Sequence, residues 1–511
     1  MIGYIMAELA LWTASFAYQY WPRDPKQPPP GAISGVPRTD EGAPLPLIYG
    51  RCRVRAPMLA WIGNWRVNLA SANSAGYQAD LLFVVGVPFH GGGATLQQIF
   101  AGDFALRLMT DTPSATIVGA TAATSRPGKS FYTSTNAANV YGGENGNGGI
   151  RGNVEFFDGR PDQQLSDDTR DTDLDNNLTI LQTRQTLAKW SVDQGNDDHV
   201  AHPALVDETL MPGYRNQAMC LLWQWVIGRI PSFTAYSFEV TSLSTGTASD
   251  LGQSLPNDAD PAAVLYDLLT SPWGKLGFPA SKVDRASFQA ASVTLFREGH
   301  GYSRPIEQSD DATTLLGDLL RQIDGILYEE PTTGQLVLRL VRSDYGDPAL
   351  LPNINPDNAR PADADWYQVQ GWSETLNQVR LTFTDRQNNY ADGLAVAQNG
   401  ANATSQTSRG LRSTDVKFVG CCTRELAEKL AARELAAVSH PLVTATVVVN
   451  RSFYTARPGS VFTLTWPELG IVNMVMRVAR VDLGQLHQGQ ITLNLIRDIF
   501  DISLGAFPVP S

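Results

Sequence analysis

Apolar residues follow two different spacings in two parts of the chain. Between residues 45 and 108, apolar runs are short and end at glycine- or proline-containing turns, as in LPLIYG and LLFVVGVP, which is typical of β-strands. Between residues 260 and 325, apolar positions recur every three or four residues, which is the spacing of a helix with one buried face. The pattern therefore predicts a mainly β protein that contains an α+β module.

Three helices and a hairpin make up that module. The helices are predicted to begin at about Asp260, Asp284 and Ser309, where a capping residue precedes an apolar stripe, and glycines follow the second and third. Residues 326–341 predict two strands around a Pro-Thr-Thr-Gly turn. We therefore assign residues 255–345 to the α+β module.

Strands return in the C-terminal part of the chain. Strands are expected over 366–385 and a long polar loop over 386–414, followed by a helix at 423–438 whose opposite charges are spaced four residues apart. Four strands then close the chain, at roughly 442–449, 461–466, 471–482 and 490–497. Together these segments predict a second barrel-sized unit with one helix.

The N-terminal part is interrupted by a polar insertion. Residues 2–21 are apolar but lack the basic region and cleavage site of a signal peptide, so we expect a packed helix rather than a membrane span. A proline-rich arm follows over 22–42. Residues 110–205 are rich in small polar residues and predict long loops and hairpins, whereas strands at 218–240 could complete the first barrel.

Composition and charge limit the classes of function that the protein can have. The 511 residues are 43% hydrophobic, which is enough for several domains with cores of their own. The formal net charge of −12 disfavours a surface that neutralises nucleic-acid phosphates. The four cysteines, Cys52, Cys220, Cys421 and Cys422, form no CxxC pair, so we expect free thiols in a protein that folds in a reducing compartment.

Two motifs could bind phosphate or metal, and each has a simpler interpretation. Residues 123–130, ATSRPGKS, fit a relaxed phosphate-loop pattern, but that mechanism needs a helix after the loop and the sequence FYTST is a poor helix former. Asp197, Asp198, His199 and His202 could hold a divalent metal, although their polar surroundings favour a solvated loop. Neither motif is taken as a site.

Thiol and sugar chemistry were weighed in the same way. Cys421 and Cys422 precede a helix, where a thiolate is favoured, but no base is near in sequence. Trp366 and Trp372 could stack on sugars, but a glycosidase needs two carboxylates about 5–10 Å apart and no acidic pair stands out. We therefore assign no catalytic, cofactor-binding or metal residues, no cofactor and no enzymatic activity.

Several segments resemble phage tail-tip hub proteins, the tip attachment or host-specificity family of siphophages. Residues 46–50, PLIYG, resemble the strand that enters the family's first barrel, and residues 260–270, DPAAVLYDLLT, resemble its helix. Residues 457–460, RPGS, resemble its last hairpin, with Ser460 where aspartate is usual, and the turn at 89–93 departs from the usual Glu-Gly-Pro. Individually weak motifs thus follow the family's order over about 40–505.

The resemblance implies a structural virion protein that forms a homotrimeric hub at the distal end of the tail tube. Such a hub adapts sixfold tube symmetry to a threefold tip, closes the tube and forms the channel for genome ejection. The implied partners are a hexameric distal tail protein or tail tube, the tape-measure protein and other tail-tip or fibre proteins. Genomic DNA would pass through the lumen without specific binding. The implied location is the virion tail tip, with assembly in the host cytoplasm.

Pattern and resemblance together give an α+β, mainly β fold with two tube-type β-barrel hub domains, an intervening α+β module and long loop insertions. The alternative function is a carbohydrate-binding or cell-wall-degrading protein of the tail tip. The expected segments are an N-terminal helix and arm at 1–40, a first barrel at 41–110 plus 205–250, an insertion at 111–204, the α+β module at 255–345, a second barrel with one helix at 346–505 and a tail at 506–511.

Overall fold

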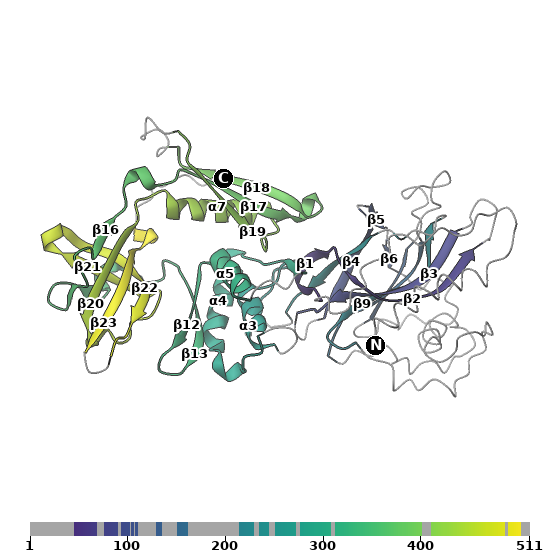
Figure 1. Cartoon of the computed structure of the whole chain (residues 1–511), viewed down its shortest axis with the longest axis horizontal. Helices are drawn as coiled ribbons and strands as arrows, with labels where there is room; N and C mark the ends of the chain where they lie inside the picture. The colour runs from purple at the N-terminus through teal and green to yellow at the C-terminus, as the bar shows by residue number, and fades with distance from the viewer. Residues whose placement is uncertain are drawn as a thin grey trace. The chain divides into compact units, whose positions relative to one another are not determined.

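Two compact units form the chain. The computed structural model describes residues 45–68, 76–89, 93–102, 104–106, 108–110, 129–134, 151–161, 214–228, 233, 235–244, 251–271, 276–307, 312–400, 410–485 and 489–501. The first unit comprises Met1–Gly246, Ser254–Ala259 and Ser303–Asp310, and the second comprises Thr247–Gln253, Asp260–Tyr302 and Asp311–Ser511. The fold is mainly β, as predicted (Figure 1). The segment predicted as a helix and arm at 2–42 lies outside the described residues.

The first unit is built from two antiparallel sheets. A five-stranded sheet has the order β11-β1-β10-β4-β5, and a six-stranded sheet has the order β2-β3-β9-β8-β7-β6. The strands of the first sheet are β1 (Leu47–Val54), β4 (Thr95–Ala101), β5 (Phe104–Leu106), β10 (Tyr236–Ser242) and β11 (Arg304–Ile306). Those of the second are β2 (Met58–Asn68), β3 (Gly76–Gly86), β6 (Leu108–Thr110), β7 (Lys129–Ser134), β8 (Arg151–Phe157) and β9 (Ala218–Gly228).

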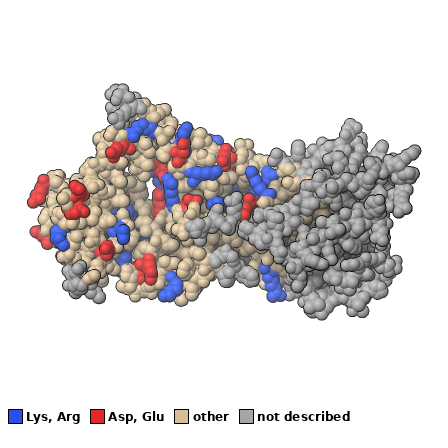
Figure 2. Space-filling model, viewed as in Figure 1, with Lys and Arg blue, Asp and Glu red and all other residues tan. Residues whose placement is uncertain are grey.

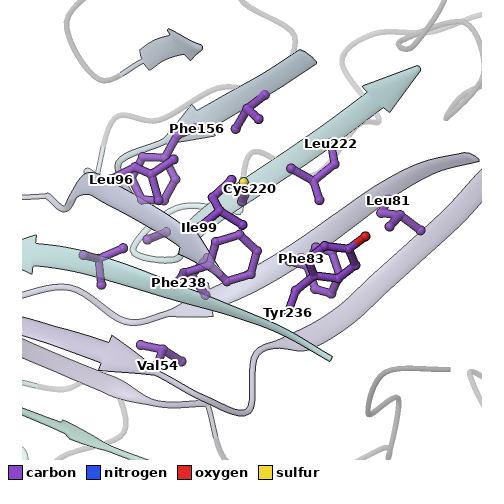
Figure 3. Close-up of a cluster of buried hydrophobic side chains, with 14 of the residues drawn as sticks. Val54, Leu81, Phe83, Leu96, Ile99, Phe156, Cys220, Leu222, Tyr236 and Phe238 are labelled. Atoms are coloured by element: carbon purple, nitrogen blue, oxygen red, sulfur yellow. The ribbon is translucent and has the colours of Figure 1, made fainter. Parts of the chain in front are cut away.

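One apolar core joins these sheets. Figure 3 shows Ile99 and Phe238 of the five-stranded sheet among Phe83 and Cys220 of the six-stranded sheet, and all four are fully buried. The rings of Phe83 and Phe238 lie 5.4 Å apart. Burial of such side chains contributes about 1.5–3 kcal/mol each. The sheets are therefore held face to face by a continuous hydrophobic layer.

The six-stranded sheet is buried on its other face as well. Leu82 and Val84 of β3 belong to a second apolar cluster with Met219, Leu221 and Phe157. Burial on both faces explains why residues 81–85, LLFVV, form an unbroken apolar run instead of an alternating one. The strength of this sequence signal thus reflects a central strand.

Part of the predicted insertion belongs to this sheet. Strands β7 and β8 lie within 111–204, and β8 pairs with β9 while placing Val154 and Phe156 in the main core. The pairing of β7 with β8 agrees with the hairpins expected in this segment, whereas their place in the sheet of the first unit was not predicted. The insertion therefore supplies structural elements of the first unit.

The second unit begins with the α+β module. It contains α3 (Pro261–Thr270), α4 (Arg285–Glu298), α5 (Ala312–Ile323) and the hairpin of β12 (Gly325–Glu330) and β13 (Gln335–Leu340). The carboxylates of Asp260 and Asp284 accept hydrogen bonds from the amides of Ala262 and Ala286, at 3.0 and 3.2 Å, and so cap α3 and α4. The predicted helices and hairpin are confirmed.

Residues 346–505, predicted as one barrel with a helix, form two sheets. The seven-stranded sheet has the order β14-β21-β22-β23-β20-β15, with β16 also paired to β20. Its strands are β14 (Asn353–Ile354), β15 (Ala359–Pro361), β16 (Tyr367–Val369), β20 (Val443–Asn450), β21 (Val461–Trp466), β22 (Ile471–Asp482) and β23 (Gln490–Arg497). The four closing strands lie where the sequence predicts them.

The helix belongs to the other, three-stranded sheet. This sheet has the order β18-β17-β19, with β17 at Gln378–Asp385, β18 at Ala391–Gln398 and β19 at Ser413–Phe418, and α7 (Arg424–Val438) packs on β17 and β18 (Figure 1). The predicted loop at 386–414 is wrong where β18 forms. One inward position of β18 must be small, because a Cβ on Gly393 would lie 2.7 Å from the Phe383 ring.

Candidate functional site at the arginine junctions of the second unit

The motifs considered for chemistry do not come together in the described residues. Lys129 and Ser130 of the phosphate-loop pattern begin strand β7 instead of the helix that such a loop requires. The acidic and histidine cluster at 197–202 lies outside the described residues. Within the described ranges, no group of three or more His, Cys, Asp or Glu side chains is placed to hold a metal. Among the same residues, no helix is long and apolar enough to cross a membrane.

The remaining candidates pack against their neighbours. Cys421 and Cys422 are both buried ahead of α7, and the Cys421 Sγ lies 3.5 Å from the Thr423 carbonyl oxygen. Burial in apolar surroundings disfavours a reactive thiolate. Trp366 packs on Trp466 with ring centroids 4.6 Å apart, whereas Trp372 is 58% exposed. The two tryptophans therefore have different environments.

Arginine side chains form two clusters of polar contacts in the second unit. The first cluster, the α5 junction, lies at the end of α5. Arg433 of α7 donates to the carbonyl oxygens of Gln322 and Arg321, at 2.9 and 3.2 Å. Its Nε also lies 2.8 Å from Asp324 Oδ2. The last carbonyls of a helix lack partners within it and carry the negative end of the helix dipole. The guanidinium of α7 thus caps α5.

Arg342 completes this α5 junction from the other side. Its guanidinium donates to the carbonyl oxygen of Ile323, at 3.2 Å, and forms a two-pronged pair with Glu298 of α4, at 2.6 and 2.8 Å. Two-pronged contacts of this kind fix orientation as well as distance. Arg433 and Arg342 therefore hold the end of α5 between α7 and α4.

Burial shapes the titration of this junction. Burial raises the pKa of Asp324, and the charge of Arg433 opposes that change. Burial, together with the positive charges of Arg433 and Arg342, lowers the pKa of His300 to about 3. A histidine with this pKa is neutral at neutral pH. The positive charge of the α5 junction therefore comes from its arginines.

A second cluster, the hairpin junction, links the β12–β13 hairpin to the seven-stranded sheet. Arg457 forms a two-pronged pair with Glu330 of β12, at 2.6 and 2.8 Å. Hydrogen bonds from Arg457 lower the pKa of Glu330 to about 2. Ser460 accepts from the amide of Arg457, at 3.1 Å, and from the Arg339 guanidinium, at 3.3 Å. The serine at the usual aspartate position of the hairpin thus has two polar partners.

Arg477 connects the two junctions. Its buried guanidinium donates to Asp498 at 2.7 Å, to the Gly459 carbonyl oxygen at 3.0 Å and to the Arg342 carbonyl oxygen at 2.8 Å. The Asp498 side chain is only 1% exposed. A buried pair of this kind needs additional hydrogen bonds to offset desolvation, and both members have them. The α+β module and the seven-stranded sheet therefore meet at a fixed geometry.

These junctions were not predicted from the sequence. Arg433 lies in a helix rich in charged pairs, where an arginine ordinarily faces solvent. Arg477 carried a usable signal, because it interrupts the apolar run of residues 474–478 in a predicted strand. Figure 2 shows acidic and basic side chains interspersed over the described surface of the second unit in this view. The buried arginines are thus distinct from an ordinary mixed surface.

Residues 311–481 match a family described as a putative phage tail protein. This segment contains α5, Arg433, Arg457 and Arg477. Comparison with curated protein sequences gave no match.

Solved structures resemble a larger part of the chain than the family match covers. A chain in the virion of a native gene transfer agent particle aligns over 94% of this chain and 91% of its own length, with 13% identity and a TM-score of 0.52, which shows a shared fold. A tail protein from Neisseria meningitidis MC58 aligns over 55% of this chain and 76% of its own, with 14% identity and a TM-score of 0.31. A 43 kDa tail protein of prophage MuSo2 from Shewanella oneidensis aligns over 57% and 78%, with 15% identity and a TM-score of 0.30. The family match and the shared fold support a phage tail protein, a structural component of the virion.

Proposed function

We propose that this tail protein is the hub at the distal end of the tail tube. In this role three copies form a ring that docks on a hexameric distal tail protein or tube, closes it and opens a channel when the genome is ejected. The main support is the division of one chain into two β-rich units, because three copies then offer six units to a sixfold tube. The order of hub-like motifs along the sequence agrees with this arrangement.

The arginine junctions fit a symmetry adapter. A hub must present its sheets to the tube at fixed angles, and directional contacts by Arg342, Arg433 and Arg477 set the geometry within the second unit. The proposed partners beyond the tube are the tape-measure protein and other tip or fibre proteins. DNA passes through the lumen without specific binding, for which the net charge of −12 provides support.

The decisive experiment is a measurement of mass and docking. Light scattering of the purified 55.6 kDa chain, alone and with the tail-tube protein from the same phage, is expected to give a mass based on three copies and a complex with one hexameric ring. Electron microscopy of that complex should show one end of the ring closed. A chain that neither forms multiples of three nor binds tube protein would overturn the hub proposal.

We also propose that the hub acts mechanically, without catalysis. The support is that tail-tip architecture accounts for the motifs without an acidic pair for sugar cleavage. Incubation of the protein with host peptidoglycan should release no reducing ends above a heat-denatured sample. Release that disappears on substitution of a single carboxylate would instead establish a cell-wall hydrolase.

A further inference from the structure

The three-stranded sheet has one open edge. Strand β18 pairs with β17 along its whole length, and no other described strand pairs with it. The opposite edge strand, β19, carries the exposed charges of Asp415 and Lys417, which discourage strand addition. The seven-stranded sheet ends on strands of two or three residues. Strand β18 has eight residues, and its one charged side chain, Asp392, pairs with Lys417 at 3.5 Å.

The side chains beside this edge are apolar. Leu394 and Val396 point to the face opposite α7 and are 50% and 51% exposed. Asp392 and Gln398 flank them on the same face, and β18 contains neither lysine nor proline. Natural proteins commonly protect an exposed edge with such residues, because unpaired backbone groups otherwise recruit another strand. An edge with a single charged residue, already paired with Lys417, is suited to pairing with another strand.

Strand β18 is complementary to itself. In an antiparallel pair across a twofold axis through Ala395, Leu394 of each copy lies opposite Val396 of the other, and Asp392 lies opposite Gln398. This register makes two apolar pairs and brings no like charges together. Moving the axis to Leu394 or Val396 would place Asp392 or Gln398 opposite an apolar side chain. The best register therefore uses the middle of the strand.

The helical layer matches the same axis. Because α7 packs on β17 and β18, it lies about one strand spacing, or ~5 Å, from an axis beside β18. Two copies of α7 would then be about 10 Å apart, which is the distance at which helices pack. Arg433 faces α5, whereas the half-buried Leu435 and Val438 lie on the other side of the helix at 100° per residue. Both layers of the subdomain thus fit a second copy.

We propose that β18 pairs with β18 of a second copy of this chain, which gives a continuous six-stranded sheet with two adjacent α7 helices. This pairing goes beyond the proposed hub and does not depend on it, because a twofold contact through β18 is separate from the surfaces that would form a trimer. A chain that is otherwise monomeric becomes a dimer, and trimers become linked to further trimers. The mass measurement therefore separates the two proposals.

Charge-complementary variants test the pairing. Leu394→Glu/Val396→Glu and Leu394→Lys/Val396→Lys should each have at most half the mass of the wild-type assembly in light scattering, and a 1:1 mixture should recover the full mass. The matched control is Leu469→Glu/Val472→Glu, and it should keep the wild-type mass. Leu469 lies in the turn before β22 and Val472 lies in β22, and they are 50% and 73% exposed. Circular dichroism establishes that each variant is folded. Equal masses for the wild type and both β18 variants, or a mixture that fails to recover, would overturn the pairing.

Cysteine cross-linking tests the register. Leu394→Cys and Val396→Cys should cross-link when mixed under oxidising conditions, and each alone should cross-link at least tenfold less. The native cysteines are buried and do not compete. Self-cross-linking of Leu394→Cys at the rate of the mixture would exclude an axis through Ala395.

Discussion

The two units of the molecule are stabilised in different ways. In the first, residues from both sheets merge in one apolar core around Phe83 and Phe238. In the second, the seven-stranded sheet and the α7 subdomain have separate cores, and arginine contacts join them to the α+β module. Apolar burial is non-directional and insensitive to charge, whereas ion pairs require both partners and a fixed geometry. One chain thus combines a continuous core with separable, oriented parts.

Truncation of a side chain in the continuous core should cause the largest loss of stability. Phe83→Ala removes a fully buried ring from between the sheets, and truncations of this kind cost about 3–5 kcal/mol. Urea unfolding should show this loss in the transition of the first unit and leave that of the second unit unchanged. Leu469→Ala, a truncation at a half-exposed site, is the control and should change stability by less than about 0.5 kcal/mol. A small effect of Phe83→Ala would argue against a shared core.

A slightly smaller effect is expected at the buried ion pair of the second unit. Arg477→Met leaves Asp498 buried without its partner, which costs about 3 kcal/mol. The double variant Arg477→Met/Asp498→Leu removes both charges and should recover at least half of that loss in a thermal-unfolding cycle. Equal losses in the single and double variants would show that packing, and not the uncompensated charge, determines the effect.

The distance in sequence between contacting residues explains which elements the sequence predicted. Local signals were sufficient for α3 and α4, because Asp260, Asp284 and Gly299 cap the helices through contacts within a few residues. They were insufficient for β18, where Phe383 of the neighbouring strand leaves room only for glycine at residue 393. The arginine junctions were also missed, because Arg433 and Arg477 meet carbonyl groups more than a hundred residues away in sequence. Contacts of that range leave no periodic pattern.

The buried carboxyl group of Asp260 should make the stability of the second unit depend on pH. Burial raises the pKa of Asp260 to about 6, against the hydrogen bonds that its carboxylate accepts. The protonated Asp260 carboxyl therefore stabilises the folded state. This contribution to the free energy of unfolding is complete below about pH 4 and is lost as the pH rises through 6. Asp260→Asn retains a capping oxygen but no charge, so it should gain about 2–3 kcal/mol on the wild type between pH 4 and pH 7.

Chemical unfolding of both proteins at several pH values checks this gain. The matched control is Asp284→Asn, the same change at the more exposed cap of α4. A difference between Asp260→Asn and wild type that stays constant from pH 4 to pH 7 would contradict the raised pKa.

The smallest effect tests whether the parts of the second unit are separable. Arg433→Gln removes the charge that caps α5 and pairs with Asp324, and the loss should be about 1–2 kcal/mol because the side chain is 21% exposed. Arg424→Gln, at a 60% exposed position of the same helix, should lose less than about 0.5 kcal/mol. If the junction orients α7, hydrogen exchange in Arg433→Gln should increase at the end of α5 while the strands β17 to β19 keep their protection. Uniform loss of protection across the second unit would mean that its parts unfold together and that the arginine acts only on global stability.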